Sequence, residues 1–255
     1  MTEPRLRLVY CGLMVAALAV LACWRLDLVE EAFSATLRNL QKGGWARWHI
    51  LAEIVLFSGI LALTWRAVPL RLDPVRDLVI IGLAACVGWV AEAWGTREGL
   101  WAYYTGERPP LWIVPAWPLG ALVVDRLADA ARRRWGGCLR SRDLDIAYRL
   151  LGATCLAVCA AFALPWLGEP KTWAVLAALA AAVAARPEPD GDFWVLATGL
   201  ACVFLADVWG TTNNCWRYYP QAHGGLGLAS GIAFGIAFDG SLVLGCLKLA
   251  NGLSR

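Results

Sequence analysis

Long apolar stretches alternate with short polar ones along almost the whole chain. The first apolar run extends from Leu8 to Cys23 and follows two arginines. No small-residue cleavage site follows this run, so we expect a retained helix rather than a signal peptide. Further apolar runs cover residues 49–65, 77–94, 111–128, 147–167, 172–185, 193–209 and 226–249. The pattern predicts about eight transmembrane helices, several of them close to the lower limit of the roughly 20 residues that a membrane helix needs.

Composition places the chain in the same class. Of its 255 residues, 59% are hydrophobic and 17% are charged, and its mean hydropathy is +0.55. A soluble domain of this size could not bury so much apolar surface, so we expect an all-α polytopic membrane protein. Residues 24–48 mix acidic, basic and aromatic side chains. This mixture is typical of a segment at the membrane interface.

One sequence motif occurs twice, at residues 92–104 and at residues 207–219. Both copies read acid-x-Trp-Gly-Thr, four further residues, and then Trp-x-Tyr-Tyr. Each copy ends an apolar run, so we expect each acid, Glu92 and Asp207, at the point where a helix gives way to a turn. Two such turns in one molecule suggest a single shared site.

The repeat also predicts the organisation of the chain. When it is divided at a basic cytoplasmic linker, residues 131–145, the spans form two sets of four in residues 1–130 and 146–255. An even number of spans per half predicts two parallel four-helix repeats, with both motifs on one side of the membrane. Most of the 23 basic residues then lie on the side of the N-terminus. The positive-inside rule therefore predicts cytoplasmic termini and outward motif loops, in a bacterial inner membrane.

Charge and cysteine content limit the partners. The formal net charge of +3 requires no nucleic-acid partner, because basic loops beside lipid headgroups account for it. The nine cysteines form no Cys-x-x-Cys pair, and His49 and His223 lack the spacing of metal ligands. We therefore expect no metal and no cofactor, and the sequence leaves the oligomeric state open.

The two motif acids are the first candidates for chemistry. A carboxyl at the end of a membrane span is costly unless it faces a cavity, a partner or water, although Glu92 and Asp207 could also cap turns at the headgroup level. Asp239, in the last span, could serve a site or an interhelical hydrogen bond. Aromatic residues near the acids could form an interfacial belt or line a pocket that stabilises positive charge. These aromatic candidates are Trp94, Trp101, Tyr104, Trp117, Trp209, Trp216 and Tyr219.

The first motif copy also resembles a known family. The pattern Glu-x-x-Gly-Thr-x-x-Gly-x-Trp-x-Tyr-Tyr at residues 92–104, followed by Val-Pro-Ala-Trp-Pro at 114–118, is similar to the signature stretch of membrane-embedded carotenoid-biosynthesis proteins. These include the bacterioruberin-type carotenoid hydratases and, more distantly, the heterodimer-type lycopene cyclases, whose halves also form a repeat. Ala116 and Trp117 occupy the place of the paired acids of those cyclases.

The resemblance implies acid-initiated chemistry on an apolar isoprenoid or carotenoid-like lipid. A carboxylic acid protonates an alkene, and water or a second double bond captures the cation. Glu92 is the first candidate for the acid and Asp207 for a base or cation stabiliser. Two other classes stay open: a carrier with carboxylates at the repeat interface, and a membrane scaffold with Trp-rich docking loops. An enclosed apolar cavity containing both acids would favour the enzyme, and a polar path through the protein would favour the carrier.

Overall fold

The computed structural model describes residues 3–185, 187–223 and 226–253, and helices dominate this part of the chain. The α-helices are α1 (Glu3–Trp24), α2 (Leu26–Lys42), α3 (Gly44–Ala67), α4 (Pro74–Glu98), α5 (Ala116–Trp135), α6 (Ser141–Phe162), α7 (Pro170–Ala184), α8 (Pro189–Thr212) and α9 (Gly227–Leu253). Two short strands, β1 (Trp101–Tyr103) and β2 (Trp216–Tyr218), form one antiparallel pair. Four 3-10 turns complete the regular structure: η1 (Val68–Leu70), η2 (Gly136–Cys138), η3 (Leu164–Trp166) and η4 (Tyr219–His223).

The chain packs as two compact units, Met1–Leu72 and Asp73–Arg255. The first unit contains α1, α2 and α3. Helix α2 has no buried residue and falls within residues 24–48, where the sequence predicts an interfacial segment. The second unit contains both motif copies. This grouping follows packing contacts, and the division into two sequence repeats stays a prediction.

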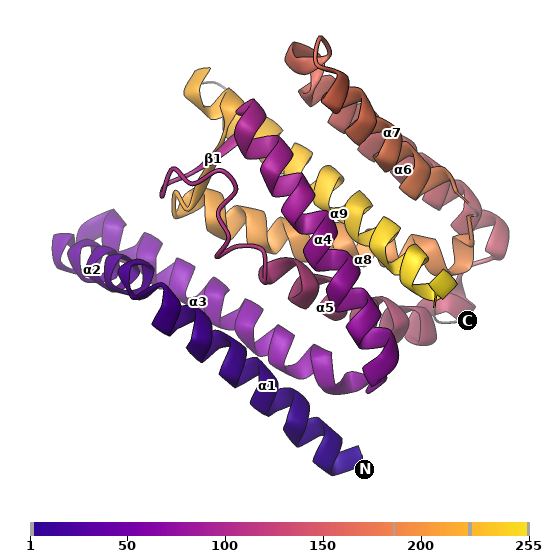
Figure 1. Cartoon of the computed structure of the whole chain (residues 1–255), viewed down its shortest axis with the longest axis horizontal. Coiled ribbons are helices and arrows are strands. Elements are labelled where there is room, and N and C mark those ends of the chain that lie inside the picture. The colour runs from indigo at the N-terminus through magenta and orange to yellow at the C-terminus, as the bar shows by residue number, and fades with distance from the viewer. Residues whose placement is uncertain (1–2, 186, 224–225, 254–255) are drawn as a thin grey trace. The chain divides into compact units, whose positions relative to one another are not determined.

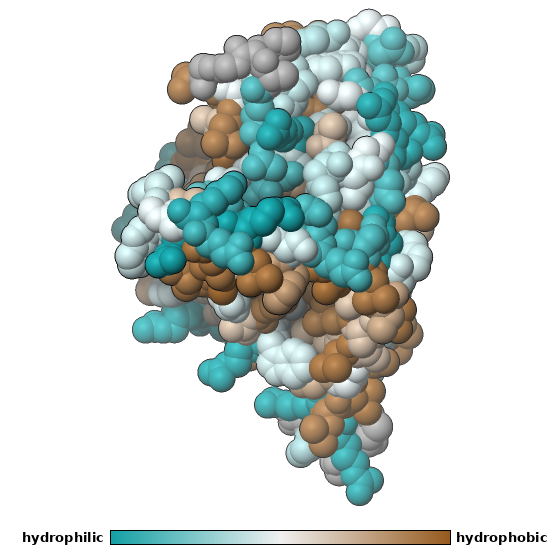
Figure 2. Space-filling model, turned by 90° about the vertical axis from the view of Figure 1, so that its left-hand side faces the viewer, coloured by the Kyte–Doolittle hydropathy of each residue, from teal (hydrophilic) through white to brown (hydrophobic). Residues whose placement is uncertain are grey.

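Six helices in the described part of the chain are long and apolar enough to cross a membrane. They lie at Pro4–Trp24, Gly44–Leu70, Pro74–Glu98, Ser141–Phe162, Pro189–Thr212 and Gly227–Leu253. Many large apolar side chains are exposed, and hydrophobic areas lie beside hydrophilic ones on the surface in Figure 2. Such exposure is expected where lipid replaces water. The all-α class and the multi-pass membrane character are thereby confirmed.

The other two predicted spans are helices that do not reach this standard. Helix α7 has 15 residues, which gives it a length of roughly 22 Å against a hydrocarbon core of about 30 Å. The predicted span 111–128 is wrong at its start, because α5 begins at Ala116. Pro109, Pro110 and Pro115 precede the helix and supply no backbone donor. Helix α5 also carries several charged residues, and the eight-span layout therefore stays a prediction.

The motif helices α4 and α8 end in the same way. Helix α4 begins after Asp73, whose side chain accepts a hydrogen bond of 3.2 Å from the Arg76 N–H. It ends at Glu98, and the following residue, Gly99, has a φ of 80°. Asn214, at the equivalent place in the second motif copy, has a φ of 57°. Glycine and asparagine are the residues that most readily adopt this left-handed conformation, so the two helices end within one residue of the same motif position.

Helix α9 is the centre of the second unit. It contacts α4, α6, α7 and α8, and Figure 1 shows it beside α4. Helices α6 and α7 run side by side and pack against it. Glycines allow the close approach: a Cβ at Gly231 would lie 2.6 Å from the Tyr218 ring, and one at Gly235 would lie 2.0 Å from an Asp207 carboxylate oxygen. Helix α9 is therefore fitted directly to the second motif copy.

Candidate functional site

The two motif copies meet at the strand pair. Trp101 of β1 lies opposite Tyr218 of β2, and Tyr103 lies opposite Trp216. The tryptophan of each copy therefore faces the tyrosine of the other. The two pairs, Trp101 with Tyr218 and Tyr103 with Trp216, are equivalent to each other, so a local twofold axis relates the two strands. The sequence repeat therefore appears as local symmetry at the strand pair.

The acids lie inside the helices rather than at their ends. Helix α4 continues to Glu98, and α8 continues to Thr212. The expectation that a turn directly follows each acid is therefore wrong. The Thr96 hydroxyl donates a hydrogen bond of 2.5 Å to the Glu92 backbone carbonyl, and the equivalent bond recurs in the second copy. These hydroxyls bond to the helix backbone itself, which allows threonine inside a buried helix.

The glycine of each motif makes room for the tryptophan that follows it. A Cβ at Gly95 would lie 1.9 Å from the Trp101 ring, and a Cβ at Gly210 would lie 1.9 Å from the Trp216 ring. Any larger residue would displace the indole. The indole in turn reaches back to the acid of its own motif copy, so the spacing of acid, glycine and tryptophan describes one local structure.

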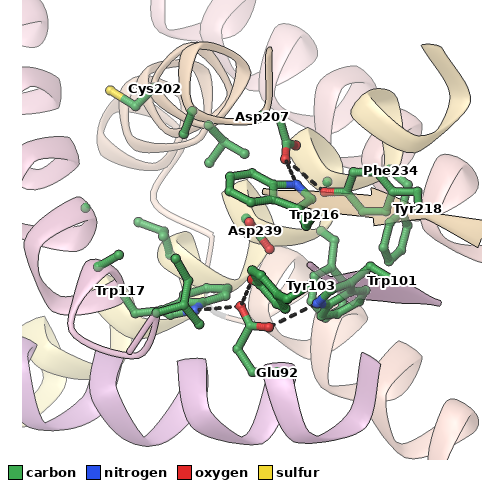
Figure 3. Close-up of a pocket in the computed structure, with 18 of the residues that line it drawn as sticks. Glu92, Trp101, Tyr103, Trp117, Cys202, Asp207, Trp216, Tyr218, Phe234 and Asp239 are labelled. Atoms are coloured by element: carbon green, nitrogen blue, oxygen red, sulfur yellow. Dashed lines mark hydrogen bonds between the residues drawn. The ribbon is translucent and has the colours of Figure 1, made fainter. Parts of the chain in front are cut away.

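Three side chains donate hydrogen bonds to the Glu92 carboxyl. Its side chain accepts hydrogen bonds from Trp101 Nε1 at 3.0 Å, from the Tyr103 hydroxyl at 3.0 Å and from Trp117 Nε1 at 3.3 Å (Figure 3). Both carboxylate oxygens take part, and the residue is only 4% exposed. Donors that converge on both oxygens stabilise the ionised form of a buried carboxyl.

Asp207 has a similar but less complete set of donors. Its Oδ1 accepts hydrogen bonds from Trp216 Nε1 at 3.2 Å and from the Tyr218 hydroxyl at 2.9 Å. Its Oδ2 is buried and accepts no hydrogen bond from any residue that the structure describes. The second motif copy has no counterpart of the Trp117 bond to Glu92 among the described residues. The two acids therefore occupy equivalent positions in the sequence repeat but differ in their hydrogen bonds.

The two motif tyrosines act as hydrogen-bond donors. Burial raises the pKa of Tyr103 well above its ordinary value, and the neighbouring Glu92 carboxylate raises it further. Burial, followed by the charge of Asp207, likewise raises the pKa of Tyr218. Both hydroxyls therefore keep their protons at neutral pH and donate hydrogen bonds to the carboxylates.

A third carboxyl, Asp239 of α9, faces the same cavity as Glu92 and Asp207. It lies between these two acids in Figure 3 and accepts no hydrogen bond from any described residue. The cavity has a volume of about 190 Å³. It is lined by Glu92, Trp101, Tyr103, Ile113, Ala116, Trp117, Gly120, Val124, Cys202, Val203, Ala206, Asp207, Trp216, Tyr218, Phe234, Gly235, Phe238, Asp239 and Val243. Three carboxyls in an otherwise aromatic and aliphatic enclosure are suited to proton transfer on an apolar molecule.

Some residues singled out in the sequence line this cavity, and others do not. Those that line it are Glu92, Asp207, Asp239, Trp101, Trp117 and Trp216. Trp94 is buried outside it and stacks on Phe238 at a centroid distance of 5.5 Å. Trp209 is half-buried and also outside it. Tyr104 is 50% exposed, and the Tyr219 hydroxyl donates to the Phe162 carbonyl at 3.2 Å.

Tyr103 and Tyr218 line the cavity, whereas the motif had pointed to their neighbours Tyr104 and Tyr219. A usable signal was present. Alternate residues of a strand point to the same side, so a strand that begins at the motif tryptophan places the first tyrosine, two positions later, beside it. The burial of β1, buried at Trp101 and Tyr103 and exposed at Ala102, follows this alternation.

A second group of buried charges lies apart from the cavity. Arg76 donates to both oxygens of Asp125 at 2.8 and 2.7 Å, and Arg126 forms ion pairs with Asp125 and Asp77. Arg76 also donates to the Asn251 side chain at 2.8 Å. These residues connect α4, α5 and α9. Because opposite charges are closely matched, we interpret the group as a structural connection.

No group of three or more His, Cys, Asp or Glu side chains in the described ranges is arranged to hold a metal ion. The backbone of His223 is described as part of η4, and its side chain lies outside what the structure describes. Comparison with known proteins found no matching family model, no matching curated protein and no matching solved structure.

Proposed function

We propose that this protein is an integral membrane enzyme that protonates a carbon–carbon double bond of an acyclic isoprenoid or carotenoid-like lipid. The observation that carries the proposal is the convergence of Glu92, Asp207 and Asp239 on one aromatic-lined cavity within a unit of apolar helices. The resemblance of the motif to carotenoid hydratases and cyclases supports the same class of reaction.

The three carboxyls differ in their hydrogen bonds, and these differences suggest their roles. Asp239 has no donor to stabilise a negative charge, so it is the best candidate for the proton donor, in place of Glu92. Glu92, held by three donors, serves as a fixed anion that attracts the developing cation. The unpaired Oδ2 of Asp207 is available to accept a proton.

The reaction balances with these carboxyls and, in a hydration, one water molecule. The Asp239 proton adds to one alkene carbon, and a carbocation forms on the other, with the rings of Trp101 and Trp216 beside it. In a hydration, water adds to the cation and gives up a proton to Asp207. In a cyclisation, a second double bond of the substrate attacks the cation, and a carbon-bound proton leaves to Asp207. Proton exchange between Asp207 and Asp239 restores the starting state.

The membrane arrangement is part of the proposal. Eight spans in two parallel four-helix repeats, with both termini cytoplasmic, would place the motif hairpin on the outer side of a bacterial inner membrane. The antiparallel pairing of β1 and β2 supports this, because parallel repeats bring both motifs to one side. The distribution of basic residues supports the direction.

A carrier is the competing hypothesis, and the cavity lining argues against it. The cavity lining includes the apolar side chains of Val124, Val203 and Val243. These side chains provide no hydrogen-bonding route for an ion or a proton. The apolar walls are those expected for a hydrocarbon substrate.

Incorporation of deuterium from D₂O tests the proposed protonation of a double bond. We expect the purified protein, incubated with an acyclic carotene in D₂O, to yield a product with deuterium on carbon, detected by mass spectrometry. Hydration would add the mass of D₂O, and cyclisation would exchange one hydrogen. The Asp239→Asn variant is expected to lose this incorporation. Unchanged mass across a panel of acyclic carotenes and prenyl lipids would contradict the proposal.

A further inference from the structure

A second, larger space lies along α9, next to the acid cavity. This groove has a volume of about 830 Å³ and is bounded by α4, α7, α9 and the beginning of α8. Its walls are mainly small and aliphatic side chains, among them Val90, Ala178, Ala182, Leu242 and Gly245. Small residues from three helices leave an elongated apolar space.

The groove and the acid cavity share one wall, the side chain of Phe238. This ring is 1% exposed and packs against Trp94, Trp101 and Phe234 at centroid distances of 5.5, 5.9 and 5.2 Å. The acid cavity, at about 190 Å³, is smaller than the roughly 300–1,000 Å³ of ordinary ligand pockets. It can enclose the reacting end of a long molecule, and the rest of that molecule needs a second space.

The shape of the groove fits an extended chain. It follows α9 from Phe238 to Leu253, a distance of roughly 22 Å at the rise of an α-helix. Its polar groups are confined to one end, where Lys248 forms an ion pair with Asp192 at 3.0 Å and Glu188 lies nearby. Two carboxylates against one ammonium disfavour an anionic headgroup such as a phosphate.

We propose that the groove binds the unreacted part of a linear, uncharged isoprenoid chain whose reacting end occupies the acid cavity. This inference rests on the proposed function. Because Phe238 separates the two spaces, a chain that reaches Asp239 displaces this ring. The acidic end of the groove disfavours the phosphate headgroup of a phospholipid, and the groove sets the length of chain that the site accepts.

The test uses photolabelling of the full chain in lipid nanodiscs. The probes are all-trans geranylgeraniol carrying a diazirine and a phosphatidylcholine carrying a diazirine on its acyl chain. Ala178 is exposed and lines the groove, while Ala177 is exposed on the same helix and does not line it. Ala178→Phe would fill part of the groove, and Ala177→Phe is the matched control.

We expect the prenol probe to label groove residues of α7 and α9, with a roughly tenfold lower yield in Ala178→Phe and an unchanged yield in Ala177→Phe. Equal prenol labelling in both variants, or preferential labelling of the groove by phosphatidylcholine, would overturn the inference. Labelling does not depend on turnover. If the prenol labels the groove while no substrate takes up deuterium, the proposed function fails and the binding site stands.

Discussion

At the scale of single residues, the three carboxyls of the cavity differ in the number of hydrogen bonds that they accept. Glu92 accepts three hydrogen bonds, Asp207 accepts two, and Asp239 accepts none from the described residues. The number of donors determines how much stability depends on each carboxylate, because every bond to a buried charge favours the folded state. The three positions should therefore respond differently to amide substitution.

Asp239→Asn is expected to lower deuterium incorporation by about 10²-fold or more, because general acid catalysis typically contributes that much. The temperature of unfolding should change little, since no donor loses its partner. Glu92→Gln should lower both deuterium incorporation and the temperature of unfolding. The free energy of unfolding should fall by about 1–3 kcal/mol, because the new amide N–H₂ faces other donors. Thermal unfolding in detergent and the isotopic assay measure the two effects. Full activity of Asp239→Asn would remove this residue from the mechanism.

Gly95→Ala tests the fit between glycine and tryptophan. The new Cβ would lie 1.9 Å from the Trp101 ring, so the indole must move, and we expect a loss of about 1–3 kcal/mol in stability. Gly82 lies on the same helix, and a Cβ there would have no atom within 4 Å, so Gly82→Ala should not lower stability. Thermal unfolding of both variants makes the comparison. Equal unfolding temperatures would contradict the role assigned to Gly95.

At the scale of elements, the strand pair converts a sequence repeat into a site. Each strand directs its tryptophan and its tyrosine toward an acid, and the second motif tyrosine, which follows the strand, lies outside the cavity. The pairing also joins the segments that follow α4 and α8, the helices that carry the acids. A pair of three-residue strands is too short to be stable alone, so packing against α9 must support it.

Tyr103→Phe should reduce activity and stability, because it removes the hydroxyl that donates to Glu92 at 3.0 Å. The expected loss of stability is about 1–2 kcal/mol for a bond to a charged group. Tyr104→Phe changes the adjacent residue, which is 50% exposed, and should have little effect on either. Thermal unfolding in detergent and the deuterium-incorporation assay measure the two effects. A larger effect at Tyr104 would show that the strand faces are assigned incorrectly.

At the scale of the whole molecule, orientation in the membrane can be tested with the natural cysteines. Cys138 is exposed, and Cys215 is half-buried within the second motif copy. In variants that retain one of the two, an impermeant maleimide should label Cys215 from the outer side and Cys138 from the cytoplasmic side. Labelling of both from the same side would contradict the eight-span arrangement.

The sequence by itself determined the membrane class, the two equivalent acids and the tryptophans that bond to them. These features depend on hydropathy and on contacts between residues close together in the chain, such as Glu92 and Trp101. A repeated spacing preserves such contacts in both copies. The sequence also indicated two parallel motifs, which the strand register expresses as local symmetry.

Only the tertiary structure decided which tyrosine faces the cavity, how α9 brings Asp239 to the motif acids, and where a long chain could lie. Asp239 and Phe238 are distant in sequence from Glu92, so no local pattern relates them to it. Their positions follow from the packing of α9 against α4 and α8, and the glycines of α9 permit its close approach to α8. The asymmetry between Glu92 and Asp207 has the same origin, because Trp117 comes from outside the repeated motif.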